Sequence, residues 1–181
     1  GTLIHSFFEQ IDWLDEGTPS AEKLRRIAEP FQRDGLNIED MLQQFRRMLK
    51  APEIDAALRR EAYRSLQWLE LAGGGYQVHS FRLEVHNEFR FAVRVGDELL
   101  TGAIDRLVLI IRDDQVEGAE IIDFKTDAVA FDDDDGIEDT VEHYRPQQEA
   151  YRSAVSQMYG LPRDKVRLRL LLVSPGLVKE L

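Results

Sequence analysis

Apolar side chains in the first 75 residues recur at helical spacing. From 2 to 15 they repeat every three or four positions, which predicts an amphipathic helix with His5 beside its apolar stripe. Thr18-Pro19 and Asn37 are typical of helix starts, and Gly73-Gly74-Gly75 is typical of a helix end. The pattern predicts four helices, at about 2–15, 19–31, 38–49 and 53–72.

After these glycines the pattern changes to the alternation of apolar and polar residues that is typical of strands. Strands are expected at about 81–95, 99–112 and 116–125 as an antiparallel meander, then a helix at about 138–159 and a strand at 166–173. A strand, a helix and a strand in that order place the last strand parallel to a neighbour. We therefore expect an α/β fold with a mixed β-sheet flanked by helices, plus a helical N-terminal segment.

Composition sets the limits of this fold. With 181 residues, 43% hydrophobic and 31% charged, the chain suits one soluble globular domain, with a helical part at 1–75 and a sheet-and-helix part at 76–181. No apolar run reaches the roughly 20 residues that a membrane-spanning helix needs. The chain has no cysteine, which excludes disulfides, Cys-ligated zinc and iron–sulfur clusters and fits a cytoplasmic location. Because a helix is already under way at Gly1, we expect a domain excised from a longer protein.

The net charge of −11 argues against strong nucleic-acid binding by this chain alone, because phosphate binding depends on Lys and Arg. Much of the acid lies between Asp132 and Glu142, and we interpret the run from Asp132 to Asp135 as a solvated loop at the rim of a site. This segment lacks the spaced acids, central glycine and terminal glutamate of an EF-hand. Local negative charge also recruits divalent cations, so the charge weakens a DNA-binding interpretation without excluding it.

Three charged residues stand in or beside apolar strand patterns. Asp105 follows Gly102-Ala-Ile, and Asp123 and Lys125 follow Ile-Ile with one residue between them. Side chains alternate along a strand, so Asp123 and Lys125 are expected on the same face. An unpaired charge is costly in a buried strand, and a metal ion would explain two acids there.

Magnesium takes oxygen ligands and commonly only one or two protein carboxylates, a count that Asp105 and Asp123 fit. A bound metal polarises a phosphodiester, while a nearby lysine orients water and offsets developing charge. A plainer interpretation also exists, in which Asp105 caps a turn with Arg106 and Asp123–Lys125 is a surface ion pair. Asp-x-Lys alone does not decide between the two.

Further motifs accompany these three residues in a fixed order. They are Gly1-Thr-Leu-Ile-His5, Glu88 in Asn-Glu-Phe, Gly102-Ala-Ile-Asp105-Arg-Leu, Asp123-Phe-Lys125-Thr and Tyr144-Arg-Pro-Gln147-x-x-x-Tyr151. The ordered set, from Gly1 to about Val173, resembles the RecB-family nuclease domain of the PD-(D/E)xK superfamily, most closely the C-terminal nuclease domain of AddA-type helicase–nuclease subunits. The resemblance implies a restriction-endonuclease-like core.

The resemblance also implies roles for individual residues. The metal ligands would be His5, Asp105, Asp123 and the backbone carbonyl of Phe124, and the remaining catalytic residues would be Lys125, Glu88, Gln147 and Tyr151. From the residues alone, a lone histidine beside an apolar stripe is more often a packing residue. In the same way Glu88 could be a solvated strand acid, Tyr151 a core residue and Gln147 a surface residue.

The resemblance implies an Mg²⁺-dependent exonuclease of the RecB/AddA type, with Mn²⁺ as a substitute and Ca²⁺ bound but poorly active. Expected partners are DNA, preferably single-stranded, a helicase domain in the same parent chain and a second helicase–nuclease subunit. The expected role of this assembly is DNA double-strand break repair and recombination. The absence of cysteine separates this chain from the AddB-type and Cas4-type nucleases, which hold an iron–sulfur cluster. No P-loop motif occurs, so unwinding would reside elsewhere. The alternatives are an inactive nuclease-fold module for DNA binding or subunit contacts, and a stand-alone restriction-type endonuclease.

Overall fold

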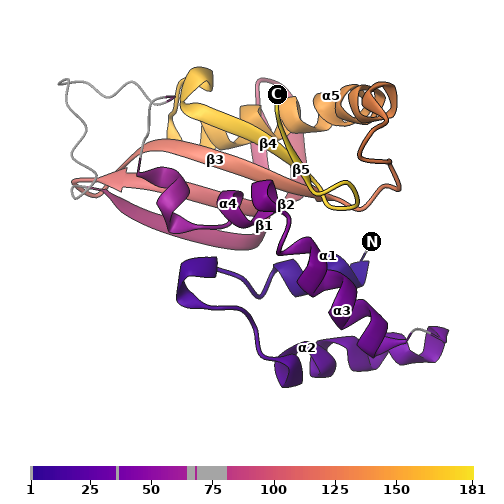
Figure 1. Ribbon diagram of the computed structural model, residues 1–181. Coiled ribbons are helices and arrows are strands. Elements are labelled where there is room, and N and C mark those ends of the chain that lie inside the picture. Colours follow the sequence, from indigo (N-terminus) through magenta and orange to yellow (C-terminus); the bar gives the residue numbers. More distant parts are fainter. Residues whose placement is uncertain (1, 36, 65–67, 69–80) are drawn as a thin grey trace.

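A five-stranded sheet forms the centre of the protein, in the strand order β1-β2-β3-β4-β5 (Figure 1). The computed structural model describes residues 2–35, 37–64, 68 and 81–181. The strands are β1 (Arg82–Val95), β2 (Glu98–Arg112), β3 (Gln115–Lys125), β4 (Val166–Leu172) and β5 (Leu177–Glu180). Strands β1 to β3 are antiparallel, β3 pairs parallel with β4, and β5 is antiparallel to β4. The sheet is therefore mixed, which confirms the α/β, restriction-endonuclease-like fold expected from the sequence.

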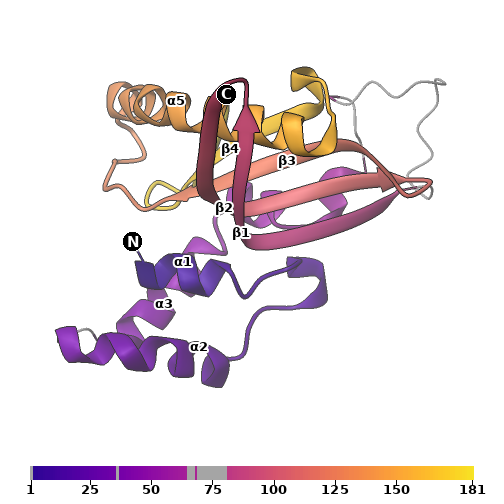
Figure 2. The same cartoon turned by 180° about the vertical axis from the view of Figure 1, so that it is seen from behind.

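The crossover between β3 and β4 is the long helix α5 (Asp134–Tyr159), which lies across one face of the sheet (Figures 1 and 2). Its Ala154 and Val155 are buried in one cluster with Leu107 of β2 and Ile121 of β3. The helix ends at Gly160, whose φ of 66° is the left-handed conformation that glycine adopts most readily. The expected C-terminal end of this helix is thus confirmed.

Short helices of the N-terminal segment lie on the opposite side of the sheet, some of them against it and some packed on other helices (Figures 1 and 2). They are α1 (Thr2–Phe8), η1 (Leu14–Glu16), α2 (Ala21–Ala28), η2 (Glu29–Asp34), α3 (Ile38–Met48), α4 (Pro52–Ala57) and η3 (Arg60–Tyr63). Phe8 of α1 stacks on Phe124 of β3 with ring centroids 4.4 Å apart, and one buried cluster joins these helices to Ile122 and Leu171 of the sheet. The helical segment therefore shares a core with the sheet.

Asn37 caps α3 as expected, since its side chain accepts from the backbone N–H groups of Glu39 and Asp40. The helix expected at 19–31 begins at Ala21 and not at Pro19, because Ser20 is its N-cap, and it ends at Ala28. Two further helix predictions were too long. The helix expected at 2–15 ends at Phe8, because the carbonyls of Ile11 and Asp12 accept hydrogen bonds from Arg106 instead of continuing helical pairing.

The helix expected at 53–72 ends at Ala57, and Arg59 is extended before η3 begins. Asp15 holds this break, because its carboxylate accepts from the backbone N–H of Arg60 at 2.6 Å and from the Arg59 guanidinium at 3.2 Å. The expected end at Gly73-Gly74-Gly75 lies outside the described residues.

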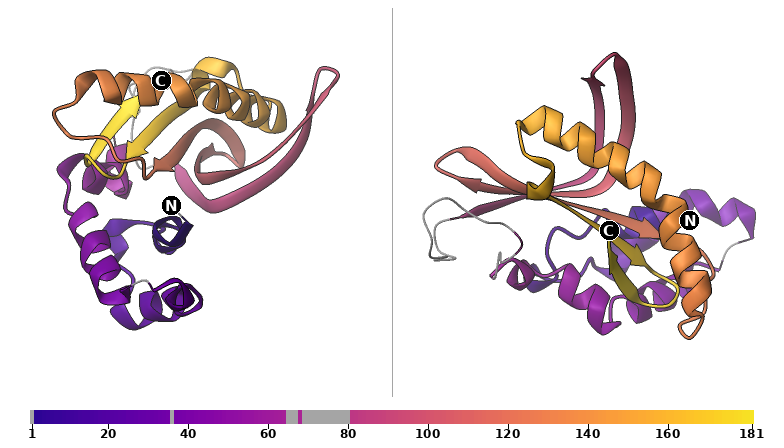
Figure 3. Two further views of the ribbon diagram at one scale, coloured as in Figure 1. Left: turned by 90° about the vertical axis from the view of Figure 1, so that its right-hand side faces the viewer. Right: turned by 90° about the horizontal axis from the view of Figure 1, so that it is seen from above.

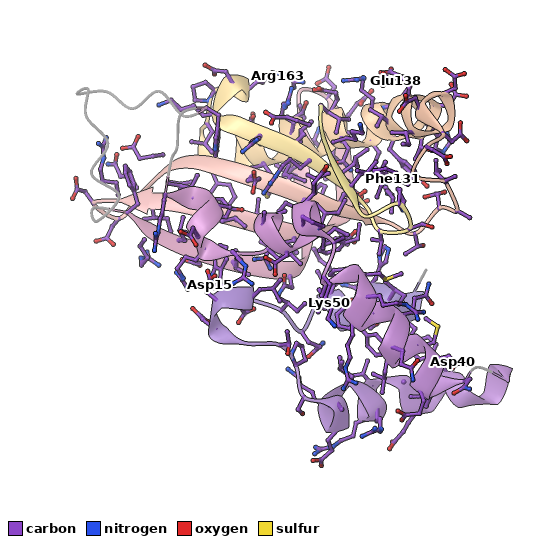
Figure 4. All side chains as sticks on the ribbon, in the orientation of Figure 1. Asp15, Asp40, Lys50, Phe131, Glu138 and Arg163 are labelled. Carbon is purple, nitrogen blue, oxygen red and sulfur yellow. The ribbon has the colours of Figure 1, made fainter. Side chains whose placement is uncertain are left out.

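The acidic segment from Asp132 to Asp135 was interpreted as a loop, and this was wrong for most of it. Asp133 is the N-cap of α5 and accepts from Gly136 N at 3.0 Å, while Asp134 and Asp135 lie in its first turn. Carboxylates at a helix N-terminus are favoured by the helix dipole, so the acids begin the helix four residues earlier than expected. Glu138 continues this acidic surface along α5 (Figure 4).

Strand β5 was not expected from the sequence. It is four residues long and follows a tight turn after β4, too short to give an alternating pattern. In the described part of the chain, no helix has the length and apolar character needed to cross a membrane.

Candidate active site

Two aspartates lie side by side where β2 and β3 run together. The β2–β3 register pairs Arg106 with Ile122, and one step further it brings Asp105 opposite Asp123. The Asp105 Oδ2 atom accepts from the backbone N–H of Phe124 at 2.8 Å, and the Asp123 side chain is only 5% exposed. Asp105 therefore does not cap a turn with Arg106, as the plainer interpretation held.

Burial makes this carboxylate pair electrostatically costly. Desolvation and then the charge of Asp123 raise the pKa of Asp105 to about 7, partly offset by the hydrogen bond from Phe124 N–H. The Asp123 Oδ2 atom is buried without a hydrogen bond of good geometry, although the Lys125 ammonium lies 2.5 Å away. Two buried carboxylates with this little compensation form a centre of negative charge that a cation would stabilise.

Lys125 lies over these acids, between the sheet and α5. Its Nζ atom is 2.5 Å from Asp123 Oδ2, as strand alternation predicted, and 3.8 Å from the centre of the Tyr144 ring. It also donates to Gln147 Oε1 at 3.3 Å. The Lys125 side chain is 12% exposed, so the pair is a largely buried contact and not the surface ion pair of the plainer interpretation.

Helix α5 presents Tyr144, Gln147 and Tyr151 on one face, since they are three and four residues apart. Gln147 Nε2 donates to the Tyr151 hydroxyl at 3.2 Å, which links Tyr151 to Lys125 through one amide. The Tyr151 ring packs directly against Gly102 of β2, which has no side chain. A Cβ at Gly102 would lie only 3.0 Å from Tyr151 and from Phe91, closer than ordinary van der Waals contact. The glycine of the Gly102-Ala-Ile-Asp105 motif thus allows the close packing of α5 against the strand.

His5 of α1 reaches the same centre from the other side of the sheet. Its Nδ1 atom lies 3.7 Å from Asp105 Oδ1, beyond hydrogen-bonding distance. Burial is the main cause that lowers the pKa of His5, which favours the neutral imidazole. A neutral imidazole nitrogen is the form that ligates a metal.

Glu88 lies at the edge of a pocket of about 580 Å³ that opens beside these residues. The lining comprises His5, Glu9, Glu88, Arg90, Phe124, Lys125, Thr126, Asp127 and Tyr144. The β1–β2 pairing passes from Asn87–Arg106 to Phe89–Ile104 and leaves Glu88 and Asp105 unpaired between them. Glu88 has a φ of 50°, a rare conformation for a residue other than glycine, so the strand is distorted at the point where the two acids face each other.

The donor set fits a hard divalent cation in chemistry and in count. In the described ranges, no three His, Cys, Asp or Glu side chains converge closely enough to form a complete metal site by themselves. Magnesium needs only one or two protein carboxylates and keeps water and substrate oxygens for the rest. Asp105 and Asp123 meet that need, with His5 beside Asp105 and Phe124 in the lining of the adjoining pocket.

Some residues at the site were given no role from the sequence. Tyr144 forms the aromatic side of the Lys125 environment and donates from its hydroxyl to Asp127 at 3.2 Å. Tyr144 lies in the Tyr-x-x-Gln-x-x-x-Tyr motif one turn before Gln147, and that spacing is the signal that pointed to it. No sequence pattern pointed to Asp127, because its contact with Tyr144 depends on how the chain turns after β3.

Arg106 and Asn87 hold the segment that follows α1. Arg106 is fully buried and donates to the carbonyl of Ile11 at 2.7 Å and to that of Asp12, and its guanidinium lies 4.9 Å from the centre of the Trp13 ring. Asn87 Nδ2 donates to the same stretch, including the carbonyl of Ile11 at 3.2 Å. The residue next to Asp105 therefore fixes the end of the helix that carries His5.

Fold and site together define a restriction-endonuclease-like domain with a buried acidic pair, a lysine and a pocket above them. The family profile of the PD-(D/E)XK nuclease superfamily matches residues 1–181, and the chain belongs to this superfamily. Membership indicates a metal-dependent nuclease. No curated protein matches the chain significantly.

Proposed function

We propose that the chain is the Mg²⁺-dependent DNA nuclease module of a helicase–nuclease of the AddA/RecB type. The observation that carries the proposal is the buried pair Asp105–Asp123 with the Lys125 ammonium 2.5 Å from Asp123. If Asp123 and Lys125 formed only a structural ion pair, the second carboxylate, Asp105, with its raised pKa, would have no purpose. A metal-dependent hydrolase, in contrast, needs both acids and a nearby cation.

Asp105 and Asp123 would supply the carboxylate oxygens that hold the metal, joined by the carbonyl of Phe124 and the neutral imidazole of His5. When bound there, a divalent cation polarises the scissile phosphate and lowers the pKa of a water. Lys125 orients that water and offsets negative charge as it develops on the phosphate. The ring of Tyr144 and the amide of Gln147 hold the lysine in place for this role.

Gln147 and Tyr151 form the α5 wall of the site and offer an amide and a hydroxyl for phosphate oxygens. Glu88, on the opposite strand, faces the pocket beside His5 and would bind metal-held water. These roles are the ones that the family resemblance implies for the three residues.

The chain acts as one nuclease domain, 1–181, with a helical part at 1–75 and a catalytic part at 76–181. The buried cluster shared by α1, α3 and the sheet supports a single folding unit. We propose that this domain is joined to a helicase domain in a longer parent chain and works with a second helicase–nuclease subunit. It would act as an exonuclease on DNA single strands in the cytoplasm, in double-strand break repair and recombination.

Cleavage of labelled single-stranded and double-stranded DNA, with Mg²⁺ and with chelator, tests the function directly. The wild-type domain should cleave only with metal, and Asp123→Ala should not cleave at all. Mn²⁺ should replace Mg²⁺, whereas Ca²⁺ should bind but support little cleavage because its looser coordination positions water poorly.

If the isolated domain is inert, the same pair of proteins is assayed again with the helicase partner. Lack of metal-dependent cleavage in both assays would favour an inactive nuclease-fold module. Sequence-specific duplex cleavage by the domain alone would favour a restriction-type endonuclease.

A further inference from the structure

The β1–β2 hairpin projects beyond the rest of the sheet and has two faces of different character (Figure 3). Side chains alternate along the strands, so residues opposite in the register share a face. The register pairs Arg90 with Ala103, Ala92 with Thr101 and Arg94 with Leu99. These six residues lie on the face on which Arg90 contacts Glu88 and lines the pocket, and together they form what we call the site-side face of the hairpin: Arg90, Ala92, Arg94, Leu99, Thr101 and Ala103.

Helix α5 covers the other face of the hairpin. Phe91 is buried there with Ile104, and Phe89, Val93 and Leu100 pack against the same cluster. The site-side face has no such cover, because five of its six residues are exposed and Ala103 is half-buried. An open surface therefore runs from the pocket, which Arg90 lines, toward the tip of the hairpin.

Both charged residues of the site-side face are arginines, in a chain whose net charge is −11. Arg90 lines the pocket, and its side chain is 82% exposed, with one contact of 3.2 Å to Glu88. Arg94 lies four residues along the same strand, roughly 13 Å further from the site at the usual rise of a strand. It is exposed and forms no ion pair with any described residue.

We propose that the site-side face of the hairpin binds the phosphate backbone of a DNA single strand and leads it to the pocket. This inference rests on the proposed nuclease function and adds the surface that receives the substrate. The two arginines stand in one row on β1, while the adjoining positions on β2 are Ala103, Thr101 and Leu99. A single row of cations matches the single phosphate backbone of one DNA strand.

Salt-dependent binding of a fluorescein-labelled oligothymidylate, measured by anisotropy in Ca²⁺ so that the strand stays intact, tests this surface. For single strands the slope of log K against log salt is about −0.7 per neutralised phosphate. Arg94→Gln should therefore reduce the slope by about 0.7, and Arg90→Gln with Arg94→Gln by about 1.4. In cleavage assays with Mg²⁺, Arg94→Gln should raise KM for the strand and leave kcat unchanged.

The matched control is Arg46→Gln with Arg47→Gln, which removes the same charge from the exposed side of α3. The control should keep the wild-type slope. The proposal is overturned if the hairpin variant keeps that slope, if the control loses as much, if only duplex binding responds, or if the wild type shows no salt-dependent binding. A wild type that binds the strand through the hairpin but never cleaves would contradict the nuclease function alone. A wild type that cleaves while the hairpin variants bind normally would contradict this surface alone.

Discussion

The two aspartates bring negative charge to a part of the sheet that water hardly reaches. Removing an ion from water costs several kcal/mol unless opposite charges or hydrogen bonds offset this desolvation free energy. Here one lysine, Lys125, lies beside two carboxylates. Asp105 receives one backbone hydrogen bond and Asp123 the contact with Lys125. The metal-free protein is therefore less stable than it would be with a neutral side chain at one of these positions.

The pH dependence of stability follows from the raised pKa of Asp105. In the unfolded chain this carboxyl titrates near 3.8, and in the folded protein near 7. Below the lower value it is protonated in both states, whereas at higher pH the unfolded state ionises first, so stability falls as pH rises through this window. Asp105→Asn removes that loss and should raise Tm in chelator at about pH 8 by at least ~2–4 °C.

Differential scanning calorimetry of both proteins in chelator measures this effect. The gain should shrink to nothing near the lower pKa, and the exposed Asp139→Asn should show no such trend. Mg²⁺ should raise the Tm of the wild type and not that of Asp105→Asn. Equal Tm differences at both pH values would show that Asp105 does not carry this cost.

Lys125 is expected to act in the chemical step, because a protonated ammonium has no lone pair with which to bind a metal. Lys125→Ala should lower kcat by about 10²–10³-fold, the usual effect of losing one charge-stabilising group. Metal affinity by titration calorimetry should be kept or increased, because the contact of Lys125 with Asp123 competes with the metal. Lys50→Ala, at an exposed position just after the end of α3, is the control. A fall in metal affinity that parallels the fall in rate would make the lysine a structural residue.

At the scale of elements, strands were predicted better than helices. The alternation of Phe89, Phe91 and Val93 with polar residues is visible in the local sequence, because one face of the strand packs on α5 and the other face is exposed to water. The apolar spacing from Leu3 to Leu14 also looked helical, yet tertiary contacts of Ile11 and Asp12 with Arg106 end the helix at Phe8. Such contacts are about 95 residues apart in sequence, and no local pattern reports them.

The clamp formed by Arg106 predicts a coupling between α1 and the metal site. Arg106→Met keeps much of the apolar volume but leaves the carbonyls of Ile11 and Asp12 without donors, which should cost about 2–4 kcal/mol. Hydrogen exchange should become faster in α1, and metal affinity should fall because His5 is no longer held near Asp105. His5→Ala is the comparison, since it should weaken metal binding with normal exchange in α1. Unchanged exchange in Arg106→Met would show that the hydrophobic contacts of Phe7 and Phe8 suffice to hold the helix.

At the scale of the whole molecule, the sequence predicted that Asp105 and Asp123 lie in strands, but not the walls of the site. Asp123 and Lys125 follow from the alternation of side chains in one strand. Gln147 and Tyr151 were reached through the resemblance alone, because only the fold brings α5 over β3. The helical segment shares its core with the sheet, so α1 belongs to the site although its histidine lies 100 residues from Asp105 in sequence.

The charge of the whole chain predicts weak DNA binding by the isolated domain. Phosphate neutralisation dominates affinity for DNA, and a protein of net charge −11 offers little of it outside the hairpin. A nuclease tethered to a motor meets its strand at high effective concentration and needs little affinity of its own. Anisotropy at moderate salt should show weak, strongly salt-dependent binding that favours single-stranded ends. Tight, metal-independent, duplex-specific binding would contradict the tethered arrangement.

The central claim is that Asp105 and Asp123 hold the metal that cleaves DNA, and the Mg²⁺ dependence of the single-turnover cleavage rate tests it most directly. For the wild type the rate on a labelled single strand should rise with Mg²⁺ to a plateau and vanish in chelator. Asp105→Asn should need far more Mg²⁺ for any cleavage and reach a plateau lower by at least about 10²-fold. Cleavage that survives chelator, or an Mg²⁺ dependence that is the same in Asp105→Asn as in the wild type, would contradict the account.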